Sequence, residues 1–154
     1  MHRLLSSLTI FATTLAGIVA ASPAAAQFAR PDDAIKYRQS VMTVMNTHLG
    51  RIGAVAQGKA AYDAKTTMDN ANIVMTMSRL PFAAFVEGSH KGDTNAKPEI
   101  WKEMDKFQAA AKNMQEQAVK LDAAAKSGNL DAIKVVFGST AKSCKDCHDK
   151  YQNE

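Results

Sequence analysis

The pentapeptide Cys144-Lys145-Asp146-Cys147-His148, near the C-terminus, constrains this chain more than any other feature. C-x-x-C-H is the attachment signature of a c-type haem, in which two thiols add to the haem vinyl groups and the histidine binds iron. Residues three and four positions apart share one helix face, so a helical segment points Cys144, Cys147 and His148 at one macrocycle. The sequence therefore predicts one covalent haem c, with His148 as an axial ligand of its iron.

Three other uses of a cysteine pair have less support. A thioredoxin-like C-x-x-C requires a βαβ context, whereas this region has helical periodicity. A structural zinc site requires four ligands, and the chain has no second cysteine pair and no H-x-x-x-H sequence to complete one. A plain disulfide is conceivable in an oxidising compartment, but it leaves His148 without a role. Haem attachment accounts for all three side chains.

The first 26 residues have the composition of a secretory signal peptide. His2 and Arg3 form a short basic start, residues 4–21 are apolar, and Ala24-Ala25-Ala26 provides an A-x-A cleavage site. Polar residues interrupt the apolar run and the cleavage site follows it directly, so cleavage is favoured over a transmembrane anchor. We expect a mature domain of residues 27–154 in the periplasm, with no membrane insertion after cleavage.

The mature domain carries little net charge. The formal net charge of the chain is +4, and Arg3 lies in the predicted leader, which leaves +3 for residues 27–154. No basic run with interleaved aromatic residues points to nucleic acid, so none is expected as a partner. The length suits one domain with one core.

Hydrophobic periodicity predicts four helices after the leader and no strand. Apolar residues alternate at spacings of three and four, as they do along a bundle seam. The segments are about 31–57, 63–80, 98–126 and 129–151. Both cysteines fall in the apolar stripe of the last segment, which places the haem inside the bundle. The predicted fold is all-α: an antiparallel up-down-up-down four-helix bundle with a covalent haem in the core near one end.

Several stretches of the chain match one known family. They come from the first helix, the central loop with the start of the third helix, and the haem segment. The stretches are Gln27-Phe28-Ala29-Arg30-Pro31, Tyr37-Arg38-Gln39-Ser40, Leu80-Pro81-Phe82-Ala83-Ala84-Phe85, Gly92-Asp93-Thr94, Lys97-Pro98-Glu99-Ile100-Trp101 and Cys144-Lys145-Asp146-Cys147-His148-Asp149-Lys150-Tyr151. With these stretches the whole mature chain resembles the cytochrome c′ family, which includes the cytochromes c-556. Ordinary c-type cytochromes carry the attachment motif near the N-terminus, so its C-terminal position is itself specific.

The resemblance implies roles for single side chains. Cys144 and Cys147 would be the thioether anchors, and His148 the proximal iron ligand. Arg38 and Gln39 match the pair that lies near the haem propionates in the family, which explains a charged residue in the apolar stripe of the first helix. The alternative for Arg38 is a side chain that snorkels to solvent at the bundle edge.

Two further positions concern the surroundings of the haem. Asp93 falls in a loop that lies near the haem in the family. Four residues after the haem-ligating histidine, many members carry Arg or Lys, whereas this chain has Gln152, with Lys150 two residues earlier. The sequence therefore gives no support for a basic residue at that proximal position.

Met42 matches the position that covers the open face of the iron in the family, and two functions stay open. In the first, an apolar pocket of Met42, Phe82 and Phe85 lies over a five-coordinate iron that binds NO and CO and takes part in one-electron transfer. In the second, the Met42 sulfur is a sixth ligand and the chain is a low-spin electron carrier of the c-556 type. Methionine at a bundle seam is also ordinary core filler. We expect the covering role.

No enzymatic activity is expected. A haem peroxidase needs a distal histidine or arginine, but His48 lies six residues from Met42 on another helix face, and His90 lies in a polar loop. The family commonly forms homodimers through its first two helices. Val41, His48 and Val55 recur every seven residues beside the main stripe of the first helix, so a homodimer is expected.

Overall fold

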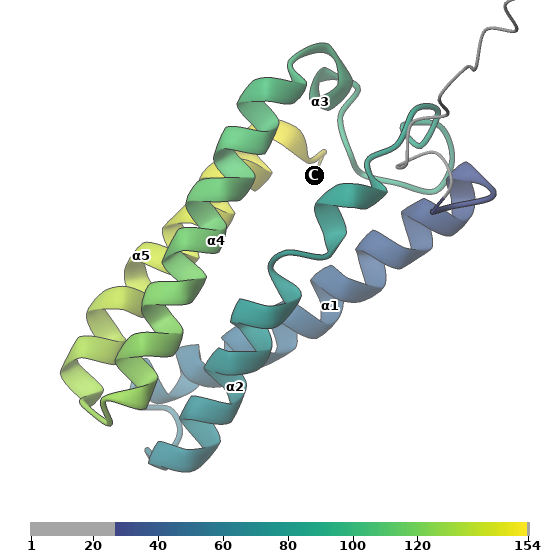
Figure 1. Ribbon diagram of the computed structural model, residues 1–154. Coiled ribbons are helices and arrows are strands. Elements are labelled where there is room, and N and C mark those ends of the chain that lie inside the picture. Colours follow the sequence, from purple (N-terminus) through teal and green to yellow (C-terminus); the bar gives the residue numbers. More distant parts are fainter. Residues whose placement is uncertain (1–26, 154) are drawn as a thin grey trace, which may run out of the picture.

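Four long helices run side by side in residues 27–153, the part of the chain that the structure, a computed structural model, describes (Figure 1). They are α1 (Pro31–Ala56), α2 (Ala64–Met77), α4 (Met104–Lys126) and α5 (Leu130–Tyr151). Each long helix is antiparallel to the next, so the predicted all-α up-down-up-down bundle is confirmed. The signal peptide predicted over residues 1–26 lies outside the described residues.

Local sequence signals set where these helices begin. Helix α1 begins at Pro31. In the first turn of a helix the backbone N–H has no hydrogen-bond partner within the helix, so proline, which lacks this N–H, fits there. The Asp63 carboxylate accepts a 2.7 Å hydrogen bond from the backbone N–H of Thr66 and caps α2, as its position predicts. The Asn129 side chain caps α5 in the same way. Helix boundaries therefore follow from residues that satisfy the free N–H groups of the first turn.

The third predicted helix is interrupted near its start. Periodicity predicts one helix over about 98–126, but the structure has a single turn, α3 (Glu99–Lys102), before α4 begins. Glu103 joins the two with φ −132° and ψ 48°, which is not helical. Its carboxylate lies 2.7 Å from Lys150 Nζ and 3.0 Å from Lys106 Nζ. The bend is thus tied to the end of α5, a long-range contact that local periodicity does not report.

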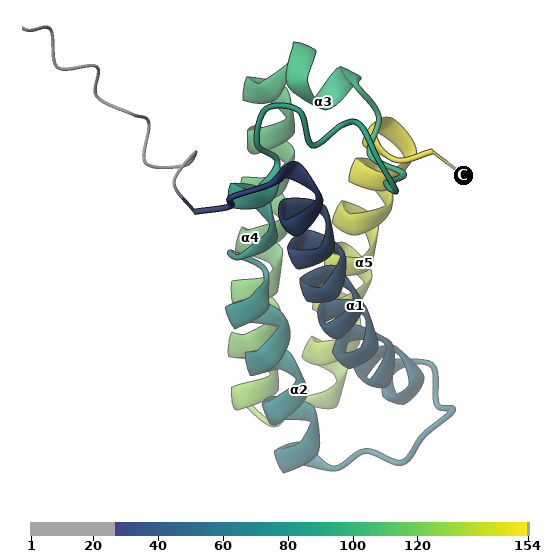
Figure 2. The same ribbon diagram turned by 90° about the vertical axis from the view of Figure 1, so that its right-hand side faces the viewer.

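The connection from α2 to α3 crosses one end of the bundle (Figures 1 and 2). It begins with a 3-10 turn, η1 (Pro81–Ala84), and continues as a polar loop. Gly88 and Gly92 in this loop have φ of 80° and 117°, a conformation that favours glycine. The end of the loop pairs with the C-terminus through an isolated antiparallel bridge between Ala96 and Gln152. The loop therefore reaches from α1 to α5 across the open end.

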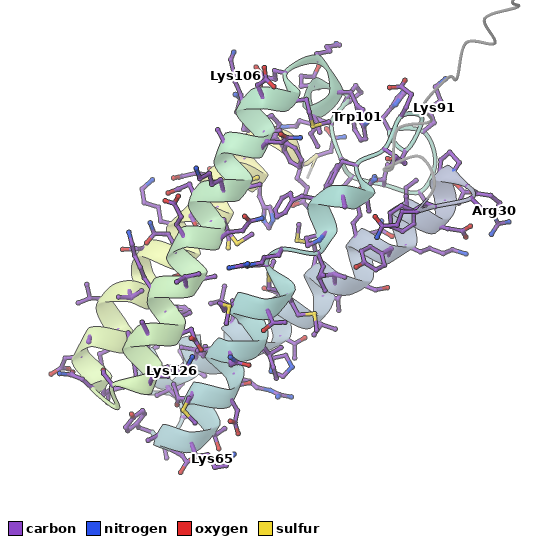
Figure 3. The ribbon with its side chains drawn as sticks, in the orientation of Figure 1. Arg30, Lys65, Lys91, Trp101, Lys106 and Lys126 are labelled. Carbon is purple, nitrogen blue, oxygen red and sulfur yellow. The ribbon has the colours of Figure 1, made fainter. Side chains whose placement is uncertain are left out.

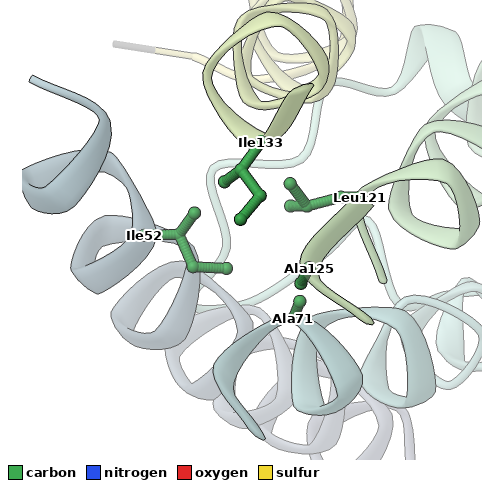
Figure 4. Packing of buried hydrophobic residues seen from close by; sticks show 5 residues of the cluster. All are labelled: Ile52, Ala71, Leu121, Ala125 and Ile133. Atoms are coloured by element: carbon green, nitrogen blue, oxygen red, sulfur yellow. The ribbon is translucent and has the colours of Figure 1, made fainter. Parts of the chain in front are cut away.

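The other end of the bundle is a closed apolar core. Figure 4 shows five residues from all four long helices converging there, each at most 2% exposed: Ile52, Ala71, Leu121, Ala125 and Ile133. The small side chains of Ala71 and Ala125 face each other between α2 and α4. Burying one large aliphatic side chain contributes about 1.5–3 kcal/mol. All four long helices therefore contribute to one core at this end, away from the loop.

Charged side chains cover the outer helix faces (Figure 3). Lys65, Lys106 and Lys126 each pair with an acidic residue three or four positions away on the same helix or at its cap. Pairs of this kind on the surface contribute little to stability. Among residues 27–153, no helix combines the length and the apolar composition that crossing a membrane requires.

Candidate haem site

A cavity of about 510 Å³ lies at the loop end of the bundle. Its wall comes from all four long helices, from η1 and from the loop that follows η1. The structure brings all nine residues that the sequence predicted for a haem site to this one cavity: Arg38, Gln39, Met42, Phe82, Phe85, Asp93, Cys144, Cys147 and His148. These side chains are up to 110 positions apart in the chain, from Arg38 to His148, so the bundle assembles the site.

The attachment motif lies along the α5 side of the cavity. Cys144 packs against a cluster that includes Met114, and Cys147 packs against a cluster that includes Tyr151. Burial raises the pKa of both thiols, so they are protonated at neutral pH. His148 is exposed at the cavity edge, one residue beyond Cys147. Two thiols and an imidazole along one wall fit a haem that lies across α5.

Arg38 is the charged residue in the apolar stripe of α1, and it is 3% exposed. Its Nη1 donates to the Ala84 carbonyl at 3.0 Å and to Ser89 Oγ at 2.8 Å. Its Nη2 donates to the Ser89 carbonyl at 2.7 Å and to Thr94 Oγ1 at 2.9 Å. The guanidinium also lies 4.5 Å from the centroid of the Phe85 ring. Arg38 therefore fastens α1 to η1 and its loop, and it does not snorkel to solvent.

No carboxylate of residues 27–153 pairs with Arg38. Burial lowers its pKa to about 10, so the guanidinium is still charged at neutral pH. A buried charge without a counter-charge is unfavourable. Haem propionates are carboxylates, and Arg38 lines the cavity that a haem would fill. The donor set on this wall thus fits the predicted cofactor.

Gln39 and Asp93 meet at the rim of the cavity, where both are exposed. Gln39 Nε2 donates to the backbone carbonyl of Asp93 at 2.9 Å, which is a second tie between α1 and the loop. The contact uses the Asp93 backbone rather than its carboxylate. Gln39 is therefore held beside Arg38 at the edge where a polar group of a cofactor would meet solvent.

Met42 of α1, Phe82 of η1 and Phe85 after it form an apolar patch on the cavity wall. Met42 and Phe82 pack against a buried cluster that contains Met45 and Val74. Phe85 packs edge-on against Phe107, with the ring centroids 4.7 Å apart. Side chains of this kind offer no hydrogen-bond donor to a group bound in the cavity.

Neither His48 nor His90 lines the cavity. His48 Nδ1 lies 2.7 Å from Asn70 Oδ1 and links α1 to α2. The His90 ring lies in the loop, with its centroid 5.3 Å from that of Trp101, which Figure 3 places at the loop end of the bundle. Within residues 27–153, His148 is thus the one histidine on the cavity wall.

Several wall residues were not predicted as site residues. Tyr151 is 4% exposed, and its ring centroid lies 5.2 Å from that of Phe107. Its place in the apolar stripe of α5, on the face of Cys147, could have identified it. Thr94 also lines the wall, and its hydroxyl accepts from Arg38. No sequence signal predicts Thr94, because the path of the loop depends on tertiary contacts.

A four-helix bundle whose last helix carries C-x-x-C-H along the wall of an internal cavity defines a class, the c-type haem proteins of helical-bundle type. A comparison with protein families identifies the group within this class. The family model described as cytochrome C′ matches residues 33–152. This chain belongs to the cytochrome c′ family, whose members are non-enzymatic proteins with one covalent haem c.

Individual relatives agree with this assignment. Cytochrome c′ of Rubrivivax gelatinosus is 46% identical over 129 residues, covering 83% of this chain and 100% of the relative. Cytochrome c′ of Alcaligenes xylosoxydans xylosoxydans is 45% identical over 128 residues, covering 83% and 99%. The crystal structure of the Rubrivivax gelatinosus protein superposes with a TM-score of 0.80, covering 82% of this chain and 100% of that one. Variants of the Alcaligenes xylosoxidans protein have been solved with nitric oxide and with carbon monoxide, each with a TM-score of 0.78 at 44% identity, covering 83% of this chain and 99% and 100% of those chains.

Proposed function

We propose that this chain binds NO and CO at a five-coordinate haem iron in the periplasm and takes part in one-electron transfer. The observation that carries the proposal is the apolar wall of Met42, Phe82 and Phe85 on the cavity. These three side chains have no donor to stabilise bound O₂, so a ligand that binds against them is favoured when it is neutral, as NO and CO are. The relatives solved with NO and CO support the same ligand class.

The haem, when bound, supplies the iron that takes up the ligand and changes oxidation state. The residues of the chain would hold it: Cys144 and Cys147 would form the two thioethers, and His148 would be the proximal ligand. Arg38 and Gln39 would lie on the propionate side. This arrangement gives the buried Arg38 charge a carboxylate partner, which it lacks among residues 27–153.

Met42 separates this proposal from a low-spin electron carrier. Its side chain is half-buried and packs with the buried Met45 cluster, so its contacts with protein hold it in place. A thioether is a weak ligand that such packing can hold off the iron. The low-spin electron carrier is kept as the second candidate, because Met42 lines the cavity in which the iron would lie.

An optical spectrum of the purified holoprotein tests the choice. With Met42 as a cover, the ferrous protein should show the broad visible envelope of a five-coordinate haem and should bind CO. Met42→Ala should then bind CO faster and more tightly while the unliganded spectrum stays high-spin. Met68→Ala, at a half-buried position outside the cavity, should leave both properties unchanged. Sharp α and β bands with poor CO reactivity, converted to a high-spin and reactive form by Met42→Ala, would instead establish His–Met ligation.

The proposal also includes export and self-association. Secretion with cleavage after Ala26 should give a mature N-terminus at Gln27, which sequencing of the periplasmic protein checks.

A homodimer through α1 and α2 would need side chains on the outer face of α1. Val41 is 9% exposed and belongs to the core, so the dimer contact would use Val44, His48 and Val55. Val44 is 40% exposed. Sedimentation should show a dimer at micromolar concentration, and a monomer there would reject the dimer.

A further inference from the structure

Methionines gather on one side of the haem cavity. The chain has eight methionines, and seven of them follow the predicted leader. Five of the seven belong to a single cluster in the middle of the bundle, which we call the methionine cluster: Met42, Met45, Met75, Met77 and Met114. Methionine fills irregular gaps in a core, and here it also places several thioethers next to the space that a haem would fill.

The cavity gives access to part of this cluster. Met42, Met45 and Met114 line the cavity wall. Met45 is 7% exposed and Met114 is 5% exposed, so both are shielded from the outer surface and face the space that the haem would fill. In the proposed function, a small hydroperoxide reaches Met42 by the route that NO and CO take to the iron. Met68 and Met104 are half-buried like Met42, but they belong to other clusters and do not line the cavity. The chain thus holds methionines of similar exposure inside and outside the site.

Once the thiols of Cys144 and Cys147 have reacted with the haem, the methionine side chains hold the other oxidisable sulfur atoms on the cavity wall. A hydroperoxide transfers one oxygen atom to methionine sulfur: the O–O bond breaks, an S=O bond forms, the sulfur loses two electrons, and hydrogen peroxide leaves as water. A dithiol reductant reverses the step by supplying two electrons and two protons, releasing the oxygen as water and becoming a disulfide. The product is polar where the thioether was apolar.

We propose that Met42, with Met45 and Met114 behind it, is a site of reversible oxidation by small hydroperoxides, and that its sulfoxide form weakens CO binding. The second half rests on the proposed function, in which Met42 covers the iron. The polarity of the distal pocket governs which ligands a haem binds. A sulfoxide oxygen carries partial negative charge and adds bulk over the iron, so it opposes a neutral ligand that the thioether admits.

The first experiment maps the oxidation. Ferric holoprotein is treated with graded hydrogen peroxide, and sulfoxide at each methionine is measured by peptide mass spectrometry. Met42 sulfoxide should form several-fold faster than sulfoxide at Met68 or Met104. A bulky reagent, cumene hydroperoxide, should lose this preference, because with the haem in the cavity only a reagent about as small as NO or CO reaches Met42. Oxidation of all three methionines at equal rates by hydrogen peroxide would overturn the proposal.

The second experiment measures the effect on ligand binding. Ferrous protein is titrated with CO before and after peroxide treatment, in the wild type, Met42→Leu and the matched control Met68→Leu. Oxidation should lower CO affinity several-fold in the wild type and in Met68→Leu but not in Met42→Leu. An equal loss in Met42→Leu would overturn the effect assigned to this residue. If the protein binds no CO before oxidation, the proposed function is wrong, and the effect on CO binding falls with it. The oxidation site itself is tested separately, by the rates of sulfoxide formation in the first experiment.

Discussion

Arg38 places a buried charge on the wall of the haem cavity and also organises the loop beside it. Its four hydrogen bonds end on three residues of η1 and the loop, Ala84, Ser89 and Thr94. Removing the guanidinium takes a donor from each of these acceptors, and a buried group left unsatisfied costs about 1–3 kcal/mol, more than the roughly 0.5–1.5 kcal/mol that a typical hydrogen bond contributes. One side chain therefore serves both the stability of the loop and the electrostatics of the cofactor site.

Arg38→Leu should lower the free energy of unfolding of the holoprotein by about 3–5 kcal/mol, as measured by urea titration. It should also lower the reduction potential, because loss of a nearby positive charge favours the ferric state, which carries one more positive charge. Gln39→Leu is the matched control: its one exposed bond to the Asp93 backbone should be worth less than about 1 kcal/mol. An unchanged potential in Arg38→Leu would contradict the propionate contact.

At the scale of elements, the contact between α1 and α5 depends on a glycine. A Cβ built on Gly53 would lie 2.7 Å from Cζ of Phe137, whose ring packs against the core cluster of Figure 4. A Cβ built on Gly50, one turn earlier on α1, meets nothing within 4 Å. Alanine at Gly53 therefore tests the packing of α1 against α5, whereas alanine at Gly50 tests only the helix propensity of α1.

Gly53→Ala should destabilise the protein by about 1–3 kcal/mol, since the Phe137 ring must shift within a packed core. Gly50→Ala should stabilise it by about 0.5–1 kcal/mol, because alanine is the better helix former and has free space there. Thermal unfolding of the two variants checks both signs. Equal shifts in the same direction would show that the α1–α5 contact is looser than these distances indicate.

Glu103 joins the bend between α3 and α4 to the end of α5. Hydrogen bonds from Lys150 and then Lys106 lower the pKa of its carboxyl from 4.5 to about 2. Because the folded-state pKa is the lower one, the stabilisation is fully present above about pH 4.5 and is lost as pH falls toward 2. Glu103→Gln should therefore lower the urea midpoint at pH 7, and the difference from the wild type should shrink at pH 3. Glu116→Gln, at an exposed position on α4, should show no such pH dependence.

The sequence predicts the elements better than it predicts the contacts between them. Apolar spacing and the Asp63 cap locate the four long helices, because each signal acts within a few residues. The bend at Glu103 escaped prediction, since it depends on Lys150 some fifty positions away. The motif and the resemblance identify nine residues that line the cavity. They miss Thr94, which accepts a hydrogen bond from Arg38, because its position depends on the path of a loop.

For the whole molecule, the cavity implies that the haem is part of the fold. A haem in this space would bury apolar side chains from all four long helices, at about 25 cal/mol per Å² of apolar surface removed from water. A chain without the cofactor lacks this contribution. The core of Figure 4 lies at the other end, and none of its five residues lines the cavity. Loss of haem should therefore loosen one end of the bundle and leave the other folded.

A variant with both Cys144→Ala and Cys147→Ala tests this division. Acid–acetone should strip haem from the variant but not from the wild type, because the variant lacks the thioether bonds. In the stripped chain, hydrogen exchange should be fast at the loop end, in η1, in α3 and in the last turns of α5, since those elements enclose the cavity. Amides near Ile52 and Ile133 should stay protected by the closed core. Haem that resists extraction from the variant would refute the attachment site, and uniform protection in the stripped chain would refute the structural role of the cofactor.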